Sequence, residues 1–148
     1  MSKTLWTFRG YTTAAGNRVV QDWYHGELNE DERALIRYRI NNLANIERHL
    51  WKDPGFKYLD KDLSEIRRKT PVGALRLYGN FPEERHTFIL LHGDYKQASN
   101  DTTGKGKALA RLKLLRQKIG NTHEFDFEEK SDSDNQKRKA GSVKNDRS

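Results

Sequence analysis

The 148-residue chain contains no cysteine, only three prolines and no apolar run that approaches the roughly 20 residues of a membrane-spanning helix. Without cysteine, neither disulfide bonds nor thiolate metal sites can form. The N-terminal residues 1–6 lack the apolar stretch of a secretory signal peptide, so we expect a cytoplasmic protein that does not contact membranes. The five histidines have no metal-ligand spacing with carboxylates, and no phosphate-binding glycine loop occurs, so we expect no cofactor.

Positive charge is concentrated in the first part of the chain. Residues 1–120 hold 22 Lys and Arg against 14 Asp and Glu, a net charge of +8, whereas residues 121–148 hold 6 against 7. A positive field of this kind attracts polyanions and speeds their association. The charge therefore favours a nucleic acid, RNA in particular, as a partner, although many basic proteins bind none.

Residues 121–148 are poor in apolar side chains, and an acidic stretch, residues 124–134, precedes a basic one, residues 137–144. Such a composition buries too little apolar surface to offset the entropy lost on ordering. We therefore expect one folded domain, residues 1–120, followed by a disordered charged tail, residues 121–148. Removal of this tail should leave the fold intact.

Hydrophobic periodicity and turn residues predict a small α+β fold within residues 1–120. The predicted elements are a strand at residues 5–9, a helix from an N-cap at Asn29 to Leu50, three strands at 64–69, 74–81 and 87–93, and a helix at 104–119. The three consecutive strands form an antiparallel meander. Together with the N-terminal strand they form one small sheet, packed with helices on one face.

Side chains alternate between the two faces of a strand. Leu75 and Leu77 point toward the helices, and the other face carries four polar side chains, Arg67, Lys69, Arg76 and Tyr78. Cations that hold phosphates, next to a ring that stacks on a base for about 1–3 kcal/mol, suit single-stranded RNA. The same pattern fits a solvated sheet face on which Glu65 pairs with either arginine, so the alternation alone leaves both interpretations open.

Three segments of the second half follow one another at a characteristic spacing: LSEIR at residues 63–67, GALRLY at 73–78 and ILLHGDYK at 89–96. In this order they resemble the RelE/HigB-type toxins of bacterial toxin–antitoxin systems, and Ala110-Arg111-Leu112 resembles a motif of that family's last helix. The resemblance covers about residues 3–119. The chain departs from the family pattern at Asp94 and Gln97 and in lacking the proline before the last helix.

The resemblance implies a metal-independent endoribonuclease that cleaves mRNA in the ribosomal A site and is bound by an acidic antitoxin. In such a reaction the ribose 2′-oxygen attacks the adjacent phosphate. The resemblance implies that Arg67 and Arg76 hold this phosphate, because an arginine fork suits its oxygens. The further catalytic candidates are Lys96 for charge and, for proton transfer, Tyr95, His92 and Asp94. The RNA-binding candidates are Lys69, Tyr78, Arg68, Lys105 and Lys107.

Several alternatives stay open at this point. His92 also fits a core histidine that is satisfied by backbone groups, and Tyr78 also fits a packing role. A ParE-like relative would poison DNA gyrase through protein contacts and would not need the Arg67/Arg76/Lys96 cluster. A catalytically inactive member that binds only RNA or a partner would explain the departures at Asp94 and Gln97.

Overall fold

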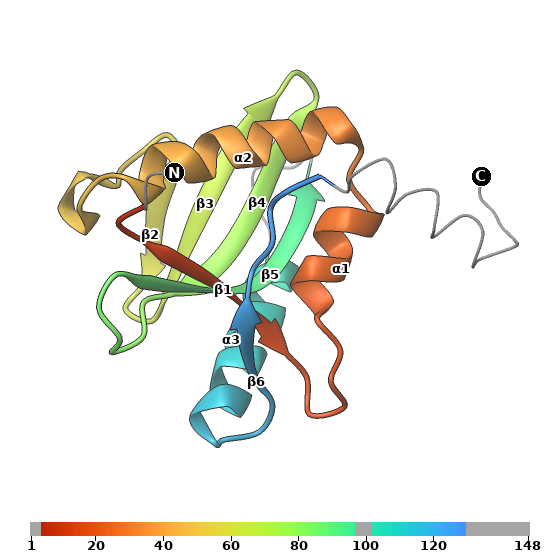
Figure 1. Cartoon of the computed structure of the whole chain (residues 1–148), viewed down its shortest axis with the longest axis vertical. Coiled ribbons are helices and arrows are strands. Elements are labelled where there is room, and N and C mark those ends of the chain that lie inside the picture. Colours follow the sequence, from red (N-terminus) through yellow and green to blue (C-terminus); the bar gives the residue numbers. More distant parts are fainter. Residues whose placement is uncertain (1–3, 97–101, 130–148) are drawn as a thin grey trace, which may run out of the picture.

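The computed structural model describes residues 4–96 and 102–129 of the chain. In order, the elements are β1 (Thr7–Thr12), α1 (Val19–Gly26), α2 (Glu30–Ala44), a 3₁₀ turn (Arg48–Leu50), β2 (Phe56–Asp60), β3 (Leu63–Thr70), β4 (Gly73–Asn80), β5 (Thr87–Lys96), α3 (Thr102–Arg116) and β6 (Asn121–Glu124) (Figure 1). The predicted α+β fold is thereby confirmed. In the described ranges, no helix has the length and apolar character needed to cross a membrane.

The strands form one sheet in the order β2-β3-β4-β5-β1-β6. The predicted meander is present, because β3 pairs antiparallel with β4 and β4 with β5. β1 lies beside β5 in parallel, with Phe8 opposite Phe88. The N-terminal strand therefore occupies the interior of the sheet and not an edge.

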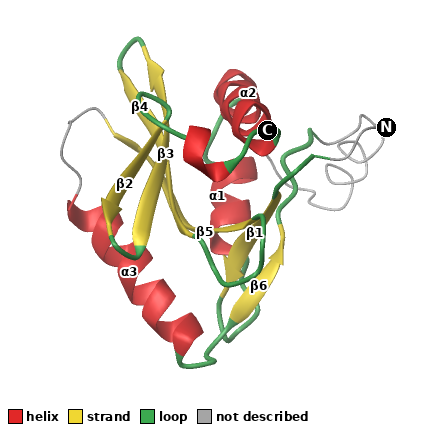
Figure 2. Ribbon diagram, turned by 90° about the vertical axis from the view of Figure 1, so that its left-hand side faces the viewer, coloured by secondary structure: helices red, strands yellow, loops and turns green. Residues whose placement is uncertain are grey.

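Helices lie on both faces of this sheet (Figure 2). The predicted helical layer is formed by α1 and α2, which cover a core that includes Phe8, Phe56, Leu75, Leu77 and Phe88. α3 packs on the opposite face, where a second core cluster comprises Tyr11, Leu63, Tyr78, Leu91, Ala108 and Leu112. α3 therefore partly covers the sheet face that the sequence pattern predicted to be open to solvent.

The longest predicted helix begins where expected but ends early. Asn29 accepts a hydrogen bond from the Glu32 backbone N–H, and the Glu32 carboxylate accepts one from the Asn29 N–H, which completes a capping box. The helix ends at Ala44, and carbonyl groups at and just beyond its C-terminus accept hydrogen bonds from two tryptophan indoles. Trp51 donates to Leu43, and Trp6 donates to Ile46.

Residues 121–129, which we call the C-terminal segment, belong to the folded domain. β6 pairs antiparallel with β1, and Phe125 is buried in the core between the sheet and α1 and α2. The Tyr24 hydroxyl donates to the Phe127 carbonyl at 2.6 Å, and Glu129 forms ion pairs with two arginines of α2, Arg33 and Arg37, at 2.7 and 2.8 Å.

The prediction of disorder from residue 121 is therefore wrong for the C-terminal segment, and the domain extends at least to residue 129. The prediction relied on the average composition of residues 121–148. It therefore overlooked three ring-bearing residues, His123, Phe125 and Phe127, which alternate with the two-residue period of a strand. The rest of the predicted tail, residues 130–148, lies outside the described part of the chain.

His123 holds the C-terminal segment close to β1. Its ring occupies the space that a side chain at position 10 would need, because a Cβ on Gly10 would lie 2.7 Å from the His123 Nε2 atom. The pKa of His123 is lowered, chiefly by burial and also by the positive charges of Arg18 and Arg9. The hydrogen bond to the Glu124 carbonyl acts in the opposite direction and raises it.

Acidification is therefore expected to destabilise the domain through His123. Because the folded-state pKa is depressed, the unfolded chain binds the proton more tightly, so this stabilisation is present above about pH 6.5 and is lost as the pH falls toward the folded-state pKa. Between pH 7.5 and pH 5.5, the free energy of unfolding measured with urea should fall further for the wild type than for His123→Gln. Equal losses would show that His123 does not carry the effect.

Candidate functional site

Three neighbouring strands bring polar side chains together on the face that α3 partly covers. In the observed register, one row across the sheet consists of Glu65, Tyr78 and His92, and the next row of Arg67, Arg76 and Asp94. Paired strands lie about 4.8 Å apart, so side chains within a row are direct neighbours. We call these six residues the polar cluster.

Most of the polar cluster is shielded from water. Arg76 and Glu65 are each 3% exposed and Tyr78 is 1% exposed, whereas the Arg67 side chain is 27% exposed. The prediction that Arg76 and Tyr78 lie on an open RNA-binding surface is therefore wrong. Tyr78 packs in the core cluster with Leu112 of α3, and Arg76 is buried beside Glu65.

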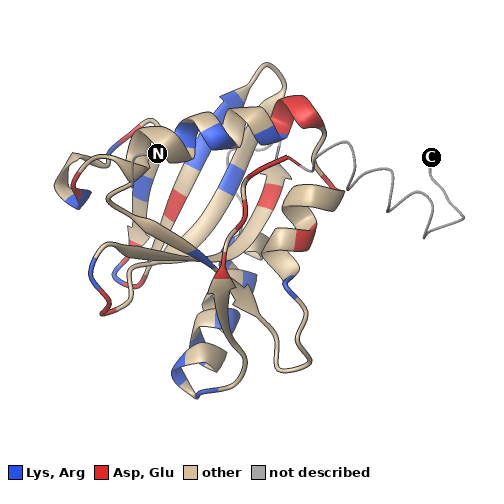
Figure 3. Cartoon of the chain, in the orientation of Figure 1, with Lys and Arg blue, Asp and Glu red and all other residues tan. Residues whose placement is uncertain are grey.

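Glu65 joins the two central arginines. One carboxylate oxygen lies 3.1 Å from Arg67 and the other lies 3.5 Å from the Arg76 Nε atom. Burial acts to lower the pKa of Arg76, but the hydrogen bond with Tyr78 and the charges of Glu65 and Asp94 together raise it. Figure 3 shows the resulting mixture of basic and acidic segments across the sheet. Arg76 is therefore a fixed cation, and Arg67 is its more accessible neighbour.

His92 and Asp94 form the second pair of the cluster. The His92 Nε2 atom lies 3.3 Å from an Asp94 carboxylate oxygen, and the His92 Nδ1 atom lies 3.2 Å from a guanidinium nitrogen of Arg111. Arginine only donates hydrogen bonds, so Nδ1 accepts and a neutral His92 carries its hydrogen on Nε2, facing Asp94. Arg111 also donates to the Leu91 carbonyl at 2.8 Å and is thereby held against β5.

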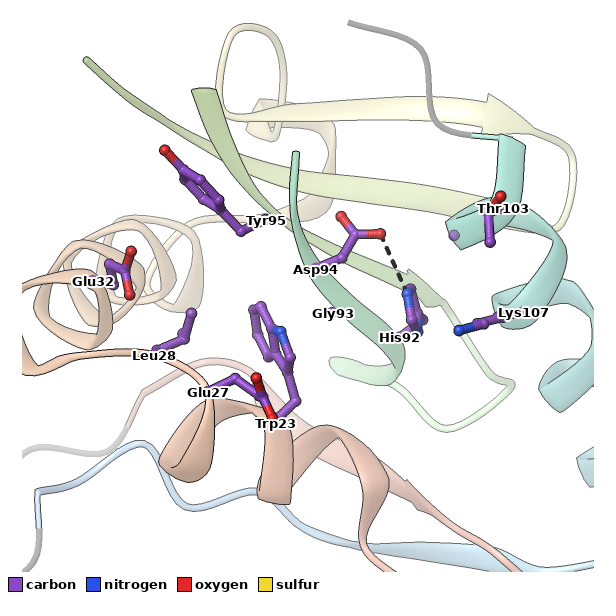
Figure 4. Close-up of a pocket in the computed structure, with 11 residues that line it drawn as sticks. Trp23, Glu27, Leu28, Glu32, His92, Gly93, Asp94, Tyr95, Thr103 and Lys107 are labelled. Carbon is purple, nitrogen blue, oxygen red and sulfur yellow. Dashed lines mark ion pairs between the residues drawn. The ribbon is translucent and has the colours of Figure 1, made fainter. Parts of the chain in front are cut away.

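A cavity of about 370 Å³ opens beside this pair (Figure 4). Its lining comes from α1 and the start of α2, from the end of β5 and from the first two turns of α3. His92, Asp94 and Lys107 lie toward α3, and Trp23 and Glu27 lie on the wall formed by α1. This volume falls within the usual range of ligand pockets, about 300–1,000 Å³.

The other predicted site residues divide between the two faces. Lys69 is exposed near the polar cluster, Lys107 lines the cavity and Lys105 is half-buried in the same turn of α3. Tyr95 packs against the core beneath α1 and α2, and its hydroxyl lies 3.1 Å from the Thr70 hydroxyl.

As alternation predicted, Arg68 lies on the face opposite the polar cluster, where its guanidinium lies 5.3 Å from the centre of the Tyr38 ring. The structure does not describe the side chain of Lys96. Neither Arg68 nor the Tyr95 hydroxyl is therefore part of the polar cluster.

Sequence reasoning missed three contributors to the site. Arg111 stood in a motif that resembled the toxin family, but no role was expected for it. Trp23 lies on α1 and Glu27 directly follows it, in a stretch for which the sequence predicted no helix or strand. Val20 and Tyr24, both buried, have the four-residue spacing that reveals this helix.

No protein-family model matches the chain, and no curated protein sequence matches it. Within residues 4–96 and 102–129, no group of three or more His, Asp and Glu side chains is arranged to hold a metal ion. The polar cluster, the cavity and the sequence motifs are therefore the features that bear on the function of this chain.

Proposed function

We propose that the protein is the toxin of a bacterial toxin–antitoxin pair, a cytoplasmic endoribonuclease that cleaves mRNA on the ribosome and is held in check by an acidic antitoxin. The observation that supports this best is the meeting of Arg67, Arg76, His92 and Asp94 on three adjacent strands, beside an open cavity. The order and spacing of the motifs at residues 63–67, 73–78 and 89–96, which resemble RelE/HigB-type toxins, also support it.

In this proposal the arginines stabilise the negative charge that grows on the phosphate during the reaction. Arg76 is fixed by Tyr78 and Glu65, so it needs no reorganisation when the transition state forms. Arg67, which is more accessible, makes the first contact with the RNA backbone. Lys69 and Lys107 contribute further positive charge around the same site.

Asp94 is the proposed general base. Because Arg111 occupies the Nδ1 atom of His92 and the Nε2 hydrogen faces Asp94, a neutral His92 has no lone pair left to take a proton. We therefore assign the Asp94 carboxylate, whose two oxygens are buried in the free protein, as the acceptor of the ribose 2′-hydroxyl proton, and His92 holds that carboxylate in place. The 2′-oxygen then bonds to phosphorus, the bond to the 5′-oxygen breaks, and the departing oxygen takes a proton from the Lys107 ammonium.

Cleavage of RNA by this route yields fragments that end in a 2′,3′-cyclic phosphate, because the substrate supplies its own nucleophile. Asp94→Asn should lower the rate by about 10²–10⁴, since the amide keeps the shape but cannot accept the proton. The measurement is the rate of mRNA cleavage by purified protein with ribosomes, with analysis of the fragment ends.

Asp62→Asn is the matched control, because Asp62 pairs with Arg116 away from the polar cluster and the cavity. It should cleave at the wild-type rate. Wild-type activity in Asp94→Asn would remove Asp94 from the mechanism. Fragments that carry 5′-phosphates would exclude attack by the 2′-oxygen.

One observation favours a second candidate, a catalytically inactive member that binds RNA or a partner. Glu65 already pairs with both Arg67 and Arg76, so part of their charge is compensated before any phosphate arrives. Retention of labelled RNA by the wild-type protein, without cleavage on or off the ribosome, would favour this candidate over the nuclease.

A further inference from the structure

We propose that the cavity beside Asp94 is a binding site for a guanine base, which would make it the element that selects where RNA is cut. This inference rests on the proposed function for its substrate, but the site itself is argued from the walls of the cavity. Two features of the cavity support this inference. Carboxylate and ammonium groups lie on opposite walls, and a tryptophan lies between the helices and β5.

One wall of the cavity, the acidic wall, carries carboxylates as its charged groups, and the opposite wall carries the Lys107 ammonium beside the Asp94 carboxylate. Glu27 directly follows α1, Glu32 lies in α2, and Lys107 comes from α3 on the other side (Figure 4). One carboxylate oxygen of Glu32 accepts the hydrogen bond from the Asn29 N–H, which commits Glu32 to capping α2. Glu27, the residue that follows α1, is exposed and supplies the acidic wall with an accessible carboxylate.

A guanine nucleotide matches this distribution of charge. A carboxylate only accepts hydrogen bonds, so it selects a base edge that presents donors. Guanine presents two adjacent donors, N1–H and the N2 amino group, which both oxygens of one carboxylate can accept. Adenine, cytosine and uracil each place an acceptor beside their donor on that edge, and this acceptor would face a carboxylate oxygen. The nucleotide's phosphate then lies toward Lys107 and the polar cluster.

Trp23 supplies an aromatic surface for the base. Its indole lies against β5 where residue 93 has no side chain, because a Cβ on Gly93 would come within 2.5 Å of two ring carbons. Trp23 is half-buried and lines the cavity, whereas Trp6 and Trp51 are 5% and 3% exposed. An aromatic ring at such a site stacks on a base, and the carboxylate beside it selects which base.

The test is titration of the full-length protein with guanosine, adenosine, cytidine and uridine 3′-monophosphates, followed by tryptophan fluorescence. We expect 3′-GMP to bind at least about tenfold more tightly than the other three nucleotides, because one bidentate pair of hydrogen bonds discriminates between bases by at least this factor. Trp23→Phe should abolish most of the fluorescence change, since the other tryptophans are buried. Glu27→Gln should reduce the preference for 3′-GMP to below about threefold, because its amide accepts at only one atom.

Glu30→Gln is the control, because it removes the same charge from an exposed residue outside the cavity. It should keep the wild-type preference, and thermal melts should show that all variants are folded. Equal affinities for the four nucleotides, or no binding, would overturn the guanine site even if the protein cuts RNA. A preference for 3′-GMP that depends on Glu27, in a protein that cuts no RNA, would support the site and overturn the nuclease.

Discussion

A chain that ends at Gly120 is expected to lose most of its stability. The deletion removes β6 from its place beside β1 and takes Phe125 and Phe127 from the core. Burial of Phe125 contributes about 1.5–3 kcal/mol and the half-buried Phe127 contributes less, whereas natural domains are stable by only about 5–15 kcal/mol in total. The truncated protein should therefore melt at a much lower temperature than the full chain, or show no cooperative transition at all. Circular dichroism during heating measures this.

The control is a chain that ends at Glu129, which keeps every contact described for the C-terminal segment. It should melt like the full-length protein. If the chain ending at Gly120 melts within a few degrees of the full-length protein, the packing of the C-terminal segment contributes little and the domain ends earlier than we infer.

Arg76→Ala is expected to impair both folding and RNA cleavage. Arg76 is 3% exposed and is paired with Glu65, which is equally buried. Removal of Arg76 takes one of two cations from the buried Glu65 carboxylate, which keeps Arg67 at 3.1 Å, so the cost should stay below the about 3–5 kcal/mol of a fully uncompensated buried charge. Under the proposed function, loss of the fixed cation also lowers the cleavage rate by about 10²–10³.

A second variant separates the two effects. Adding Glu65→Gln to Arg76→Ala removes the buried carboxylate that has lost one of its two partners and should recover part of the stability, but it should not restore cleavage. Arg85→Ala, an exposed arginine outside the polar cluster, should change stability by less than about 0.5 kcal/mol. Urea unfolding and cleavage assays on the same preparations give both readouts. A folded Arg76→Ala protein with the wild-type cleavage rate would remove Arg76 from the site.

Local patterns were sufficient to predict the parts of the fold that depend on neighbouring residues. The capping box at Asn29 and the meander of β3, β4 and β5 follow from signals within a few residues of each element. The short elements α1, β2 and β6 were missed because eight, five and four residues carry little periodicity. The parallel pairing of β1 with β5 joins segments about 80 residues apart, and no local pattern encodes it.

The sequence predicted which residues belong to the candidate site better than it predicted how deeply they are buried. Alternation placed Arg67, Arg76 and Tyr78 on one face, and the resemblance to toxins added His92 and Asp94. The burial of Arg76 and Tyr78 depends on how α3 packs and on the buried carboxylate of Glu65, and both are tertiary features. Trp23 and Glu27 could not be placed in the site, because the path of α1 was not predicted.

The position of β1 has a consequence for synthesis of the protein. β1 leaves the ribosome before every other strand of this sheet, yet its two neighbours, β5 and β6, follow much later in the sequence. At about 5–20 residues per second, translation reaches β6 several seconds or more after β1 has emerged. Until then, both edges of β1 lack their partner strands, and the core of Phe8, Phe88 and Phe125 cannot close. The domain therefore completes its fold only after β6 has been made, and a chain terminated before β6 exposes a strand that is prone to pair with other chains.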